Sequence, residues 1–479
     1  MRIKKFYFTA GLLALLAFAI PIESKYDKLF RFYSLTLIPD GIEIPSIFDK
    51  KIYFYPSDIA ALLLFIAAIV WFRVPLSRLF LQRGTCYLWI FFGCSLASIL
   101  ASPFVNYPVI YIRLWQLLTP ILLFSFLSSA FEEEEKPKLI RLILGALILA
   151  ALFQTAVAIA QYFTQDWLGL RMLSEPKNRP MFGSWNGNRW IFDRIFERVG
   201  TSTCLFRSSG TLPHPNVLGG FLAISILASY AFLMQMGEKK KFWSRCWLGL
   251  TLPFQFFALT VSYSRSAIFA LVLGTFAWFA LLAWSRGIKP IAADRTVRFV
   301  AGMICLSAAL SGTLLFDQLA QRGGIVNYNL VAQYSDNVRI HYQNVALKMI
   351  EKNPLLGVGF HQFSLRYPSY LPANSDTSIY HSAAHNIYLL IASESGLIAL
   401  AAFLLWIGTL LYAALRSPVD PTSASLIAIF IAFLFIGACD FYPILFQQGK
   451  LLFFCTAGLL AAKVKQTRTA QMAKLVPYQ

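Results

Sequence analysis

The chain contains about twelve apolar runs, each close to the twenty or so residues that an α-helix needs to cross the hydrocarbon core of a bilayer. Such a core offers no water to backbone polar groups, so spanning segments must be helices or closed barrels. The runs therefore predict an all-α fold, a polytopic membrane helix bundle in which residues 1–479 form a single integral-membrane domain. They cover roughly 6–22, 57–73, 85–101, 109–129, 139–163, 214–236, 246–262, 266–284, 299–316, 386–415, 422–439 and 449–463.

The charge of the chain has a membrane explanation. Of the 479 residues 57% are hydrophobic and only 14% are charged, yet the net charge is +19. In a soluble protein such an excess would point to nucleic acid, but in a membrane protein Lys and Arg mark the cytoplasmic loops. We therefore expect the lipid bilayer as a partner and no nucleic acid. Of the seven cysteines only Cys204 lies in a polar loop, so neither a disulfide framework nor a cysteine metal site is expected.

The basic residues also predict an orientation. With an even number of spans both termini lie on one side of the membrane, and the basic clusters fall on that same side. The short turns on the other side, 102–108 and 440–449, contain no Lys or Arg. The positive-inside rule then places both termini in the cytoplasm. The basic clusters lie at 2–5, 73–83, 239–245, 286–298 and 463–474.

This topology makes three outer segments long, 23–56, 164–213 and 317–385, and places all five histidines on the outer side. Long loops in compact proteins are usually functional or disordered, and the mixture of aromatic, proline and glycine residues in these three argues against disorder. We expect 164–213 to form an outer loop. Segment 317–385 is predicted to be a large, partly helical periplasmic loop that carries catalytic residues.

A helix is predicted over residues 337–352 of that large loop. Its apolar side chains recur at helical spacing, and Asn353-Pro354 ends the pattern. The stripe predicts an amphipathic helix over the outer mouth of the bundle, with Arg339 near its beginning. The stripe consists of Val338, Tyr342, Val345 and Met349.

The sequence SYSRS at 262–266 interrupts two apolar runs and forms a very short outer turn. An arginine at a helix end often extends only to the lipid headgroups. The positive-inside rule disfavours arginine in so short an outer turn, however, and the neighbouring hydroxyls, including Ser264, add hydrogen-bond donors. We therefore favour phosphate binding by Arg265.

The sequence RSSGTLPHPN at 207–216 directly precedes the sixth span, and its glycine and two prolines predict a rigid, tightly turned entry. Asn216 fits the N-cap of that span, so a structural role is the favoured interpretation for it. Arg207 and His214 would add charge to the outer side of the bundle and are candidate substrate contacts.

The segment HSAAHN contains two histidines four residues apart, His381 and His385. Two such histidines on one helix face can hold a metal, but no third ligand lies nearby in sequence, so metal binding is the less favoured interpretation. The alternative is that His385, at the water-facing start of a span, acts as a general base, because histidine exchanges protons near neutral pH. Asn386 is then expected to cap that helix.

Glu394 lies nine residues further along the same span. An acid at that depth is costly and therefore usually functional or paired. A continuous helix would place it about 13 Å from His385, too far to orient the histidine. Gly396 offers a break in the helix that would change this geometry.

Four motifs together resemble the O-antigen ligase and O-antigen polymerase superfamily of bacterial envelope glycosyltransferases, over nearly the whole chain. All four lie on the same side of the predicted bundle. They are RSSGTLPHPNVLGGFLA at 207–223, SYSRSA at 262–267, the stretch from Arg339 to NPLLGVGFHQF at 353–363, and HNIYLLIASESGL at 385–397.

The resemblance implies a transferase that needs no metal or other cofactor and works at the outer face of the bacterial inner membrane. Its donor is a glycan linked through diphosphate to undecaprenol, and its acceptor is a glycolipid or glycan, such as the lipid A core. The essential residues of the ligase branch match Arg265, Arg339 and His385. The remaining candidate substrate contacts are Arg207, His214, Asn216, Ser264, Asn386 and Glu394. The polymerase branch and relatives that glycosylate protein hydroxyls share this architecture, with the ligase branch slightly favoured.

The residues themselves fit this chemistry. Guanidinium groups stabilise the charge that develops on a departing diphosphate, and a histidine accepts the proton of the attacking hydroxyl. Single displacement would invert the anomeric centre, and a polyprenyl tail would lie between helices. A transporter or flippase also has about twelve spans, but it usually places charged residues near the membrane midplane. A non-catalytic scaffold is the third alternative.

Overall fold

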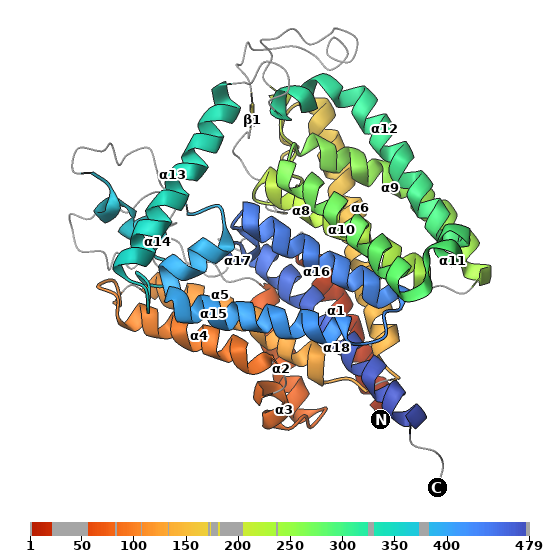
Figure 1. Ribbon diagram of the computed structural model, residues 1–479, viewed down its shortest axis with the longest axis horizontal. Helices are drawn as coiled ribbons and strands as arrows, with labels where there is room; N and C mark the ends of the chain where they lie inside the picture. Colours follow the sequence, from red (N-terminus) through yellow and green to blue (C-terminus); the bar gives the residue numbers. More distant parts are fainter. Residues whose placement is uncertain are drawn as a thin grey trace. The chain divides into compact units, whose positions relative to one another are not determined.

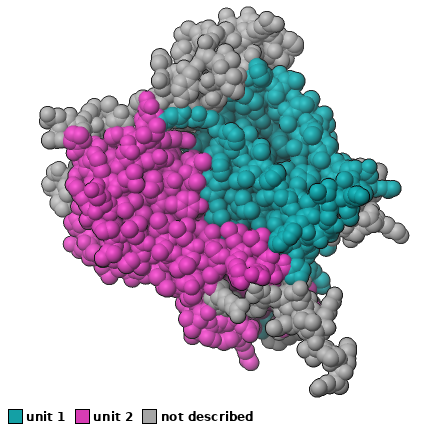
Figure 2. All heavy atoms as spheres, viewed as in Figure 1, with its two compact units in different colours: residues 1–24, 137–336, 418–436 teal, residues 25–136, 337–417, 437–479 magenta. Residues whose placement is uncertain are grey.

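The computed structural model describes residues 2–21, 56–81, 84–106, 108–132, 134–170, 173, 181–182, 205–235, 238–323, 330–372 and 383–475. Within these ranges the chain is almost entirely helical. It divides into two compact units, coloured separately in Figure 2. Unit 1 comprises residues 1–24, 137–336 and 418–436, and unit 2 comprises 25–136, 337–417 and 437–479.

Unit 1 is built from long helices that pack on one another (Figure 1). Helix α8 packs against α9 and α10, and α12 packs against α9. A two-residue antiparallel pair, β1 (Met181–Phe182) and β2 (Leu205–Phe206), adds the strand structure. The helices are α1 (Arg2–Ala19), α6 (Lys136–Thr164), α8 (Pro215–Gln235), α9 (Glu238–Val261), α10 (Arg265–Arg286), α11 (Ile288–Ala293), α12 (Arg295–Gly323), the first turns of α13 (Leu330–Lys352) and most of α16 (Pro421–Cys439).

Unit 2 contains the remaining helices and the rest of α13. Helix α5 packs against α18 and α2, and α15 packs along α4 (Figure 1). Its elements are α2 (Pro56–Val70), α3 (Leu76–Leu81), α4 (Thr85–Leu100), α5 (Pro108–Ser129), α14 (Phe363–Arg366), the 3₁₀ turn η2 (Tyr367–Tyr370), α15 (Ile387–Leu415), α17 (Tyr442–Leu445) and α18 (Gln447–Leu475).

Each of the predicted spans coincides with a helix. Among the described residues, seven helices are long and apolar enough to cross a membrane, and four shorter apolar helices accompany them. The predicted polytopic helical bundle is thereby confirmed. Nearly all of segment 23–56 and most of 164–213 lie outside the described residues. The single-domain organisation and the orientation of the termini stay predictions.

The predicted helix of the large loop is present as α13, which begins earlier than expected, at Leu330. Its apolar stripe packs on a hydrophobic cluster of unit 2, with Val338 at the edge and the other three members buried. This cluster, called the α13 cluster below, joins four segments of the chain. Its buried members are Tyr342, Val345, Ala346, Met349, Val358, Phe363, Tyr367, Tyr370, Ala383, Ala384, Leu390 and Phe441.

Helix α15 is broken at Gly396, whose φ of 87° lies in the left-handed region that favours glycine. The NPLLGVG segment at 353–359 lies against the break, so closely that a Cβ on Gly396 would collide with the backbone of Leu355. Freed backbone groups are paired across it: Leu397 N donates to Pro354 O at 2.7 Å, and Val358 N donates to Ser393 O at 2.9 Å. Non-helical backbone inside a membrane bundle requires such pairing.

Candidate functional site

The SYSRS turn of unit 1 is held in place by a buried arginine. Arg207 is 8% exposed, and its Nε and Nη2 donate to Ser262 O at 3.1 and 3.0 Å. Its Nη2 also donates to Asn216 Oδ1 at 2.8 Å. A guanidinium that bonds several acceptors at once fixes their relative positions. Arg207 and Asn216 are therefore used inside the fold, in support of the turn.

The loop that carries Arg207 is anchored to α6 by two buried glutamines. Gln161 Oε1 accepts the backbone N–H groups of Ser209 and Gly210 at 3.1 and 2.8 Å. Gln154 Oε1 accepts the Thr211 N–H at 2.9 Å. Buried backbone groups need such partners, so this loop has its conformation specified from within the unit.

Helix α8 contributes close packing to the same turn. A Cβ added to Gly219 would lie 2.8 Å from both Ser262 Oγ and Ser264 Cβ. The glycine thus lets the helix backbone approach the turn directly. The RSSGTLPHPNVLGG motif and the SYSRS turn are consequently two parts of one structure.

The predicted cap of α8 was assigned to the wrong residue. The helix begins at Pro215, a residue favoured at the first helical position because its φ is already helical. His214 precedes it, and its Nδ1 accepts the Asn216 N–H at 3.1 Å. His214 therefore caps the helix, and Asn216 lies inside its first turn.

Arg265 begins α10 and remains accessible, with 31% of its side chain exposed. It forms an ion pair with Asp336 in the first turns of α13, a residue that our sequence analysis did not single out. Ser264 is the N-cap residue of α10, without a side-chain capping bond, and its Oγ lies 3.4 Å from Ser266 Oγ. Unlike Arg207, Arg265 offers its guanidinium at the surface of the unit.

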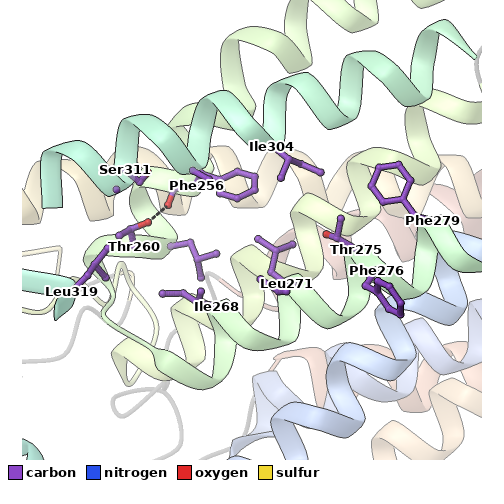
Figure 3. A pocket seen from close by; sticks show the side chains of 14 residues that line it. Phe256, Thr260, Ile268, Leu271, Thr275, Phe276, Phe279, Ile304, Ser311 and Leu319 are labelled. Carbon is purple, nitrogen blue, oxygen red and sulfur yellow. Dashed lines mark hydrogen bonds between the residues drawn. The ribbon is translucent and has the colours of Figure 1, made fainter. Parts of the chain in front are cut away.

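An apolar pocket of about 430 Å³ lies among α9, α10 and α12 of unit 1. Figure 3 shows Thr260 and Leu319 toward one end of the pocket, and Phe276 and Phe279 toward the other. On α10 the lining begins at Ile268, one turn after Arg265. The remaining lining residues are Phe256, Leu259, Leu271, Val272, Thr275, Ile304, Ala308, Ser311 and Gly312.

In unit 2, His385 lies just before α15 and faces a buried carboxylate. Its Nδ1 is 3.6 Å from Asp440 Oδ1, and the Asp440 side chain is only 3% exposed. The ring also packs on Phe441, with 4.4 Å between centroids. Nδ1 has no hydrogen-bond partner among the described residues, so the acid acts on the ring through its charge. The sequence did offer a signal for Asp440, an acid in a short apolar turn.

Asp440 is held by a backbone hydrogen bond and lies near the buried Tyr442. Its Oδ1 accepts the Phe441 N–H at 2.8 Å, which fixes the carboxylate next to the histidine. Burial, and secondarily the charge of Asp440, raise the pKa of Tyr442 well above its usual value, so this phenol stays neutral. The acid therefore lies in a setting where charge is weakly screened.

Asn386 caps α15 as predicted. Its Oδ1 accepts the N–H groups of Tyr388 and Leu389 at 2.9 and 3.1 Å, and its Nδ2 donates to Ala438 O at 3.1 Å. The residue thus ties the start of α15 to the chain just before Asp440. A role of Asn386 in substrate binding stays a prediction.

Arg339 lies on α13, partly buried, and makes no hydrogen bond or ion pair with any residue in the described part of the chain. Its charge acts on Cys439, the neighbour of Asp440. The α13 cluster includes Ala384 and Phe441, which adjoin His385 and Asp440 in sequence. Unit 2 therefore packs the helix of Arg339 against the segments that carry the histidine and its acid.

Glu394 is buried and bonded to the NPLLGVGFHQF segment. Its two carboxylate oxygens accept the N–H groups of His361 and Phe363, each at 3.0 Å. The break that our sequence analysis anticipated at Gly396 lies beyond Glu394, and the carboxylate serves this loop. Substrate binding by Glu394 stays a prediction.

No group of three His, Cys, Asp or Glu residues suited to a metal ion occurs within the described ranges. His381 lies outside those ranges.

A known protein family matches the part of the chain that carries most of these side chains. Residues 250–404 match the O-antigen ligase family. The match contains the SYSRS turn, α13 with Arg339, and His385, and it confirms the predicted resemblance. The motif at 207–223 lies outside the matched residues. No curated protein matches the chain. The O-antigen ligase match supports a glycosyltransferase-like activity at a membrane.

Proposed function

We propose that this protein transfers a glycan from undecaprenyl diphosphate to an acceptor hydroxyl, on the lipid A core or a similar molecule. The reaction takes place at the outer face of the bacterial inner membrane, with both termini cytoplasmic. The observation that carries the proposal is the pairing of His385 with Asp440 beside the helix of Arg339, inside the O-antigen ligase match. A hydroxyl nucleophile needs a proton acceptor, and this arrangement supports His385 in that role.

The diphosphate leaving group is bound by Arg265 and Arg339. As the bond between the anomeric carbon and the phosphate oxygen breaks, its electron pair passes to the diphosphate, where two guanidinium groups stabilise the added charge. Arg265 is exposed and paired with one carboxylate, and Arg339 is without a partner among the described residues. Both are therefore available, and the diphosphate replaces Asp336 at Arg265.

His385 accepts the proton of the attacking hydroxyl. Its Nδ1 faces Asp440, which leaves Nε2 for the acceptor. The new bond forms between the hydroxyl oxygen and the anomeric carbon on the face opposite the diphosphate, so the configuration inverts. Asp440 stabilises the imidazolium that forms through its nearby negative charge.

The α9–α10–α12 pocket takes part of the polyprenyl tail. Its lining is almost wholly apolar and starts one turn from Arg265, so a lipid with an anionic headgroup fits both features. Phe276 is 70% exposed and Val272 is 61% exposed, which gives the tail a lateral opening toward the bilayer.

The direct test uses purified protein in nanodiscs with an undecaprenyl-diphosphate glycan and a glycolipid acceptor. We expect a glycosylated acceptor, release of undecaprenyl diphosphate, and an inverted anomeric linkage by NMR. A retained configuration would contradict the single displacement. Movement of the donor across a vesicle bilayer without any transfer would favour the flippase alternative.

A further inference from the structure

A second group of polar side chains lies inside unit 2, where α2, α5 and α18 meet. Thr119 Oγ1 donates to Asp58 Oδ1 at 2.7 Å, and Gln447 Nε2 donates to the same oxygen. Gln447 Nε2 also lies 3.1 Å from Thr119 Oγ1. All three side chains are at most 3% exposed. None of these three side chains has a role in the proposed transfer reaction.

Lys450 follows Gln447 by three residues on α18, so the two share a helix face. The lysine is only 2% exposed. Its ammonium has no hydrogen-bond acceptor among the residues that the structure describes, although Arg113 and Asp58 both act on it electrostatically. A buried charge is costly unless hydrogen bonds satisfy its donors. An oxyanion that reached this ammonium would supply such hydrogen bonds.

The charges that act on Lys450 do not balance in the part of the chain that the structure describes. Arg113, whose Nη1 donates to Gln116 Oε1 at 2.9 Å, adds a second positive charge near the lysine. Burial, followed by the charges of Arg113 and Lys450, lowers the pKa of His361 well below its usual value, so that ring is neutral. Within the described ranges, two positive charges thus act together with one carboxylate, Asp58. The first turn of α18 adds the positive end of its helix dipole.

A polar acceptor completes the group. Gln447 Oε1 is buried without a hydrogen-bond partner among the described residues. Arg113 is only partly buried, so the group reaches the surface of the unit there. Donors for an oxyanion and an acceptor for a hydroxyl therefore occur on one face of α18.

We propose that Lys450, Arg113 and Gln447 form a binding subsite for an acidic saccharide. A carboxylate or phosphate ester of the sugar binds the two cations, and a neighbouring sugar hydroxyl donates to Gln447 Oε1. Such a subsite would select acidic glycans or acceptors and does not depend on the transfer mechanism proposed above. The oxyanion could come from a sugar or from a lipid headgroup, and the experiment separates these sources.

The test measures thermal unfolding of the full chain in zwitterionic nanodiscs with glucuronic acid, glucose 6-phosphate or glucose. The two acidic sugars should raise Tm, and glucose should not. Lys450→Gln should weaken this effect about 10- to 100-fold, since hydrogen bonds to charged groups contribute on that scale. Lys352→Gln, the matched control at an exposed cation of the same unit that lies over the Tyr370 ring, should leave it unchanged. If Lys450→Gln does not accumulate, Arg113→Gln takes its place.

Three results would overturn the subsite. The first is the absence of a shift, or an equal shift with glucose. The second is an undiminished shift in the variant. The third is found in nanodiscs that contain phosphatidylglycerol: the lipid alone raises Tm, and the acidic sugars no longer raise it further. This result would assign the oxyanion to a lipid headgroup. Intact transfer with no sugar shift would reject the subsite alone.

Discussion

The arginine turn of unit 1 and the histidine end of unit 2 are held by different forces. Residues 262–264 are fixed by buried hydrogen bonds, chiefly from Arg207 to Ser262 O. His385 is held by ring packing on Phe441 and by the nearby charge of Asp440, while Asn386 fixes the backbone beside it. A hydrogen-bonded turn presents a guanidinium at a fixed place, whereas a packed ring beside an acid suits proton transfer.

Unit 1 itself contains two arginines with different roles. Arg207 is buried and bonds three acceptor groups, counting a longer contact to Tyr263 O at 3.5 Å. Arg265 is accessible and pairs with Asp336. The same side chain thus serves the fold at one position and is available to a ligand at the other. Arg207 is buried and bonds carbonyl oxygens of the turn, whereas Arg265 is accessible and pairs with a carboxylate that a ligand can displace.

The largest effect is expected at the histidine. His385→Ala should reduce glycan transfer by about 10² to 10⁴-fold, the usual contribution of a general base, at normal membrane abundance. His341→Ala is the matched control, because His341 bonds Tyr367 OH at 2.6 Å within the same unit and has no proposed role in the chemistry. His381→Ala should be much milder, and EDTA should not inhibit the wild type. Equal loss in His381→Ala, with EDTA inhibition reversed by a divalent ion, would favour the metal interpretation.

The arginines come next. Arg265→Lys and Arg339→Lys should each lower kcat/KM by about 10- to 100-fold, because an ammonium cannot make the paired bonds of a guanidinium. Both variants should fold and insert normally. Arg207→Lys should instead reduce the amount of folded protein, since carbonyls of the turn lose their donor. Full activity at equal abundance in either of the first two variants would remove that arginine from the diphosphate site.

Asp440→Asn should have a smaller effect, about tenfold or roughly 1.4 kcal/mol in activation free energy. The loss should appear in kcat and not in KM, because the charge of Asp440 is needed when the imidazolium forms and not when the donor binds. A purely structural role of Asp440 would lower the amount of folded protein and leave kcat unchanged, so kcat at matched protein amounts distinguishes the two.

Stability should respond at the break in α15. Gly396→Ala forces a Cβ into the left-handed region and against Leu355, at a cost of about 1–2 kcal/mol for the conformation alone. Gly408→Ala in the same helix has nothing within 4 Å of the new Cβ, so it should be neutral or stabilising by up to about 1 kcal/mol. Thermal unfolding in nanodiscs measures both, and equal Tm values would contradict the described break.

The smallest effect concerns acid stability. The pKa of His361 is lowered in the folded protein, so the unfolded chain binds more protons below its ordinary value of about 6.5. The contribution of His361 to the free energy of unfolding should therefore be fully present above that pH, and the free energy should fall as the pH decreases below it. His361→Gln should reduce this slope, and an unchanged slope would show that other groups cause it.

Local patterns in the sequence predicted much of this structure. Apolar run lengths located the helices, the stripe of α13 predicted its buried face, and Asn386 was recognised as a cap because capping depends on adjacent residues. Pairings between distant residues were not predicted. Arg265 and Asp336 are 71 residues apart, and Arg207 and Ser262 are 55 residues apart. No local periodicity specifies such contacts. Asp440 and the partners of Glu394 depend on the same kind of tertiary packing.

The central claim is that Arg265 binds the leaving group while His385 moves the proton. It is tested most directly by measuring equilibrium binding of undecaprenyl diphosphate, without a glycan, to nanodisc-embedded variants. We predict that Arg265→Lys binds it about 10- to 100-fold more weakly than the wild type, and that His385→Ala keeps wild-type affinity although transfer is lost. Wild-type affinity in Arg265→Lys together with weakened binding in His385→Ala would contradict the account.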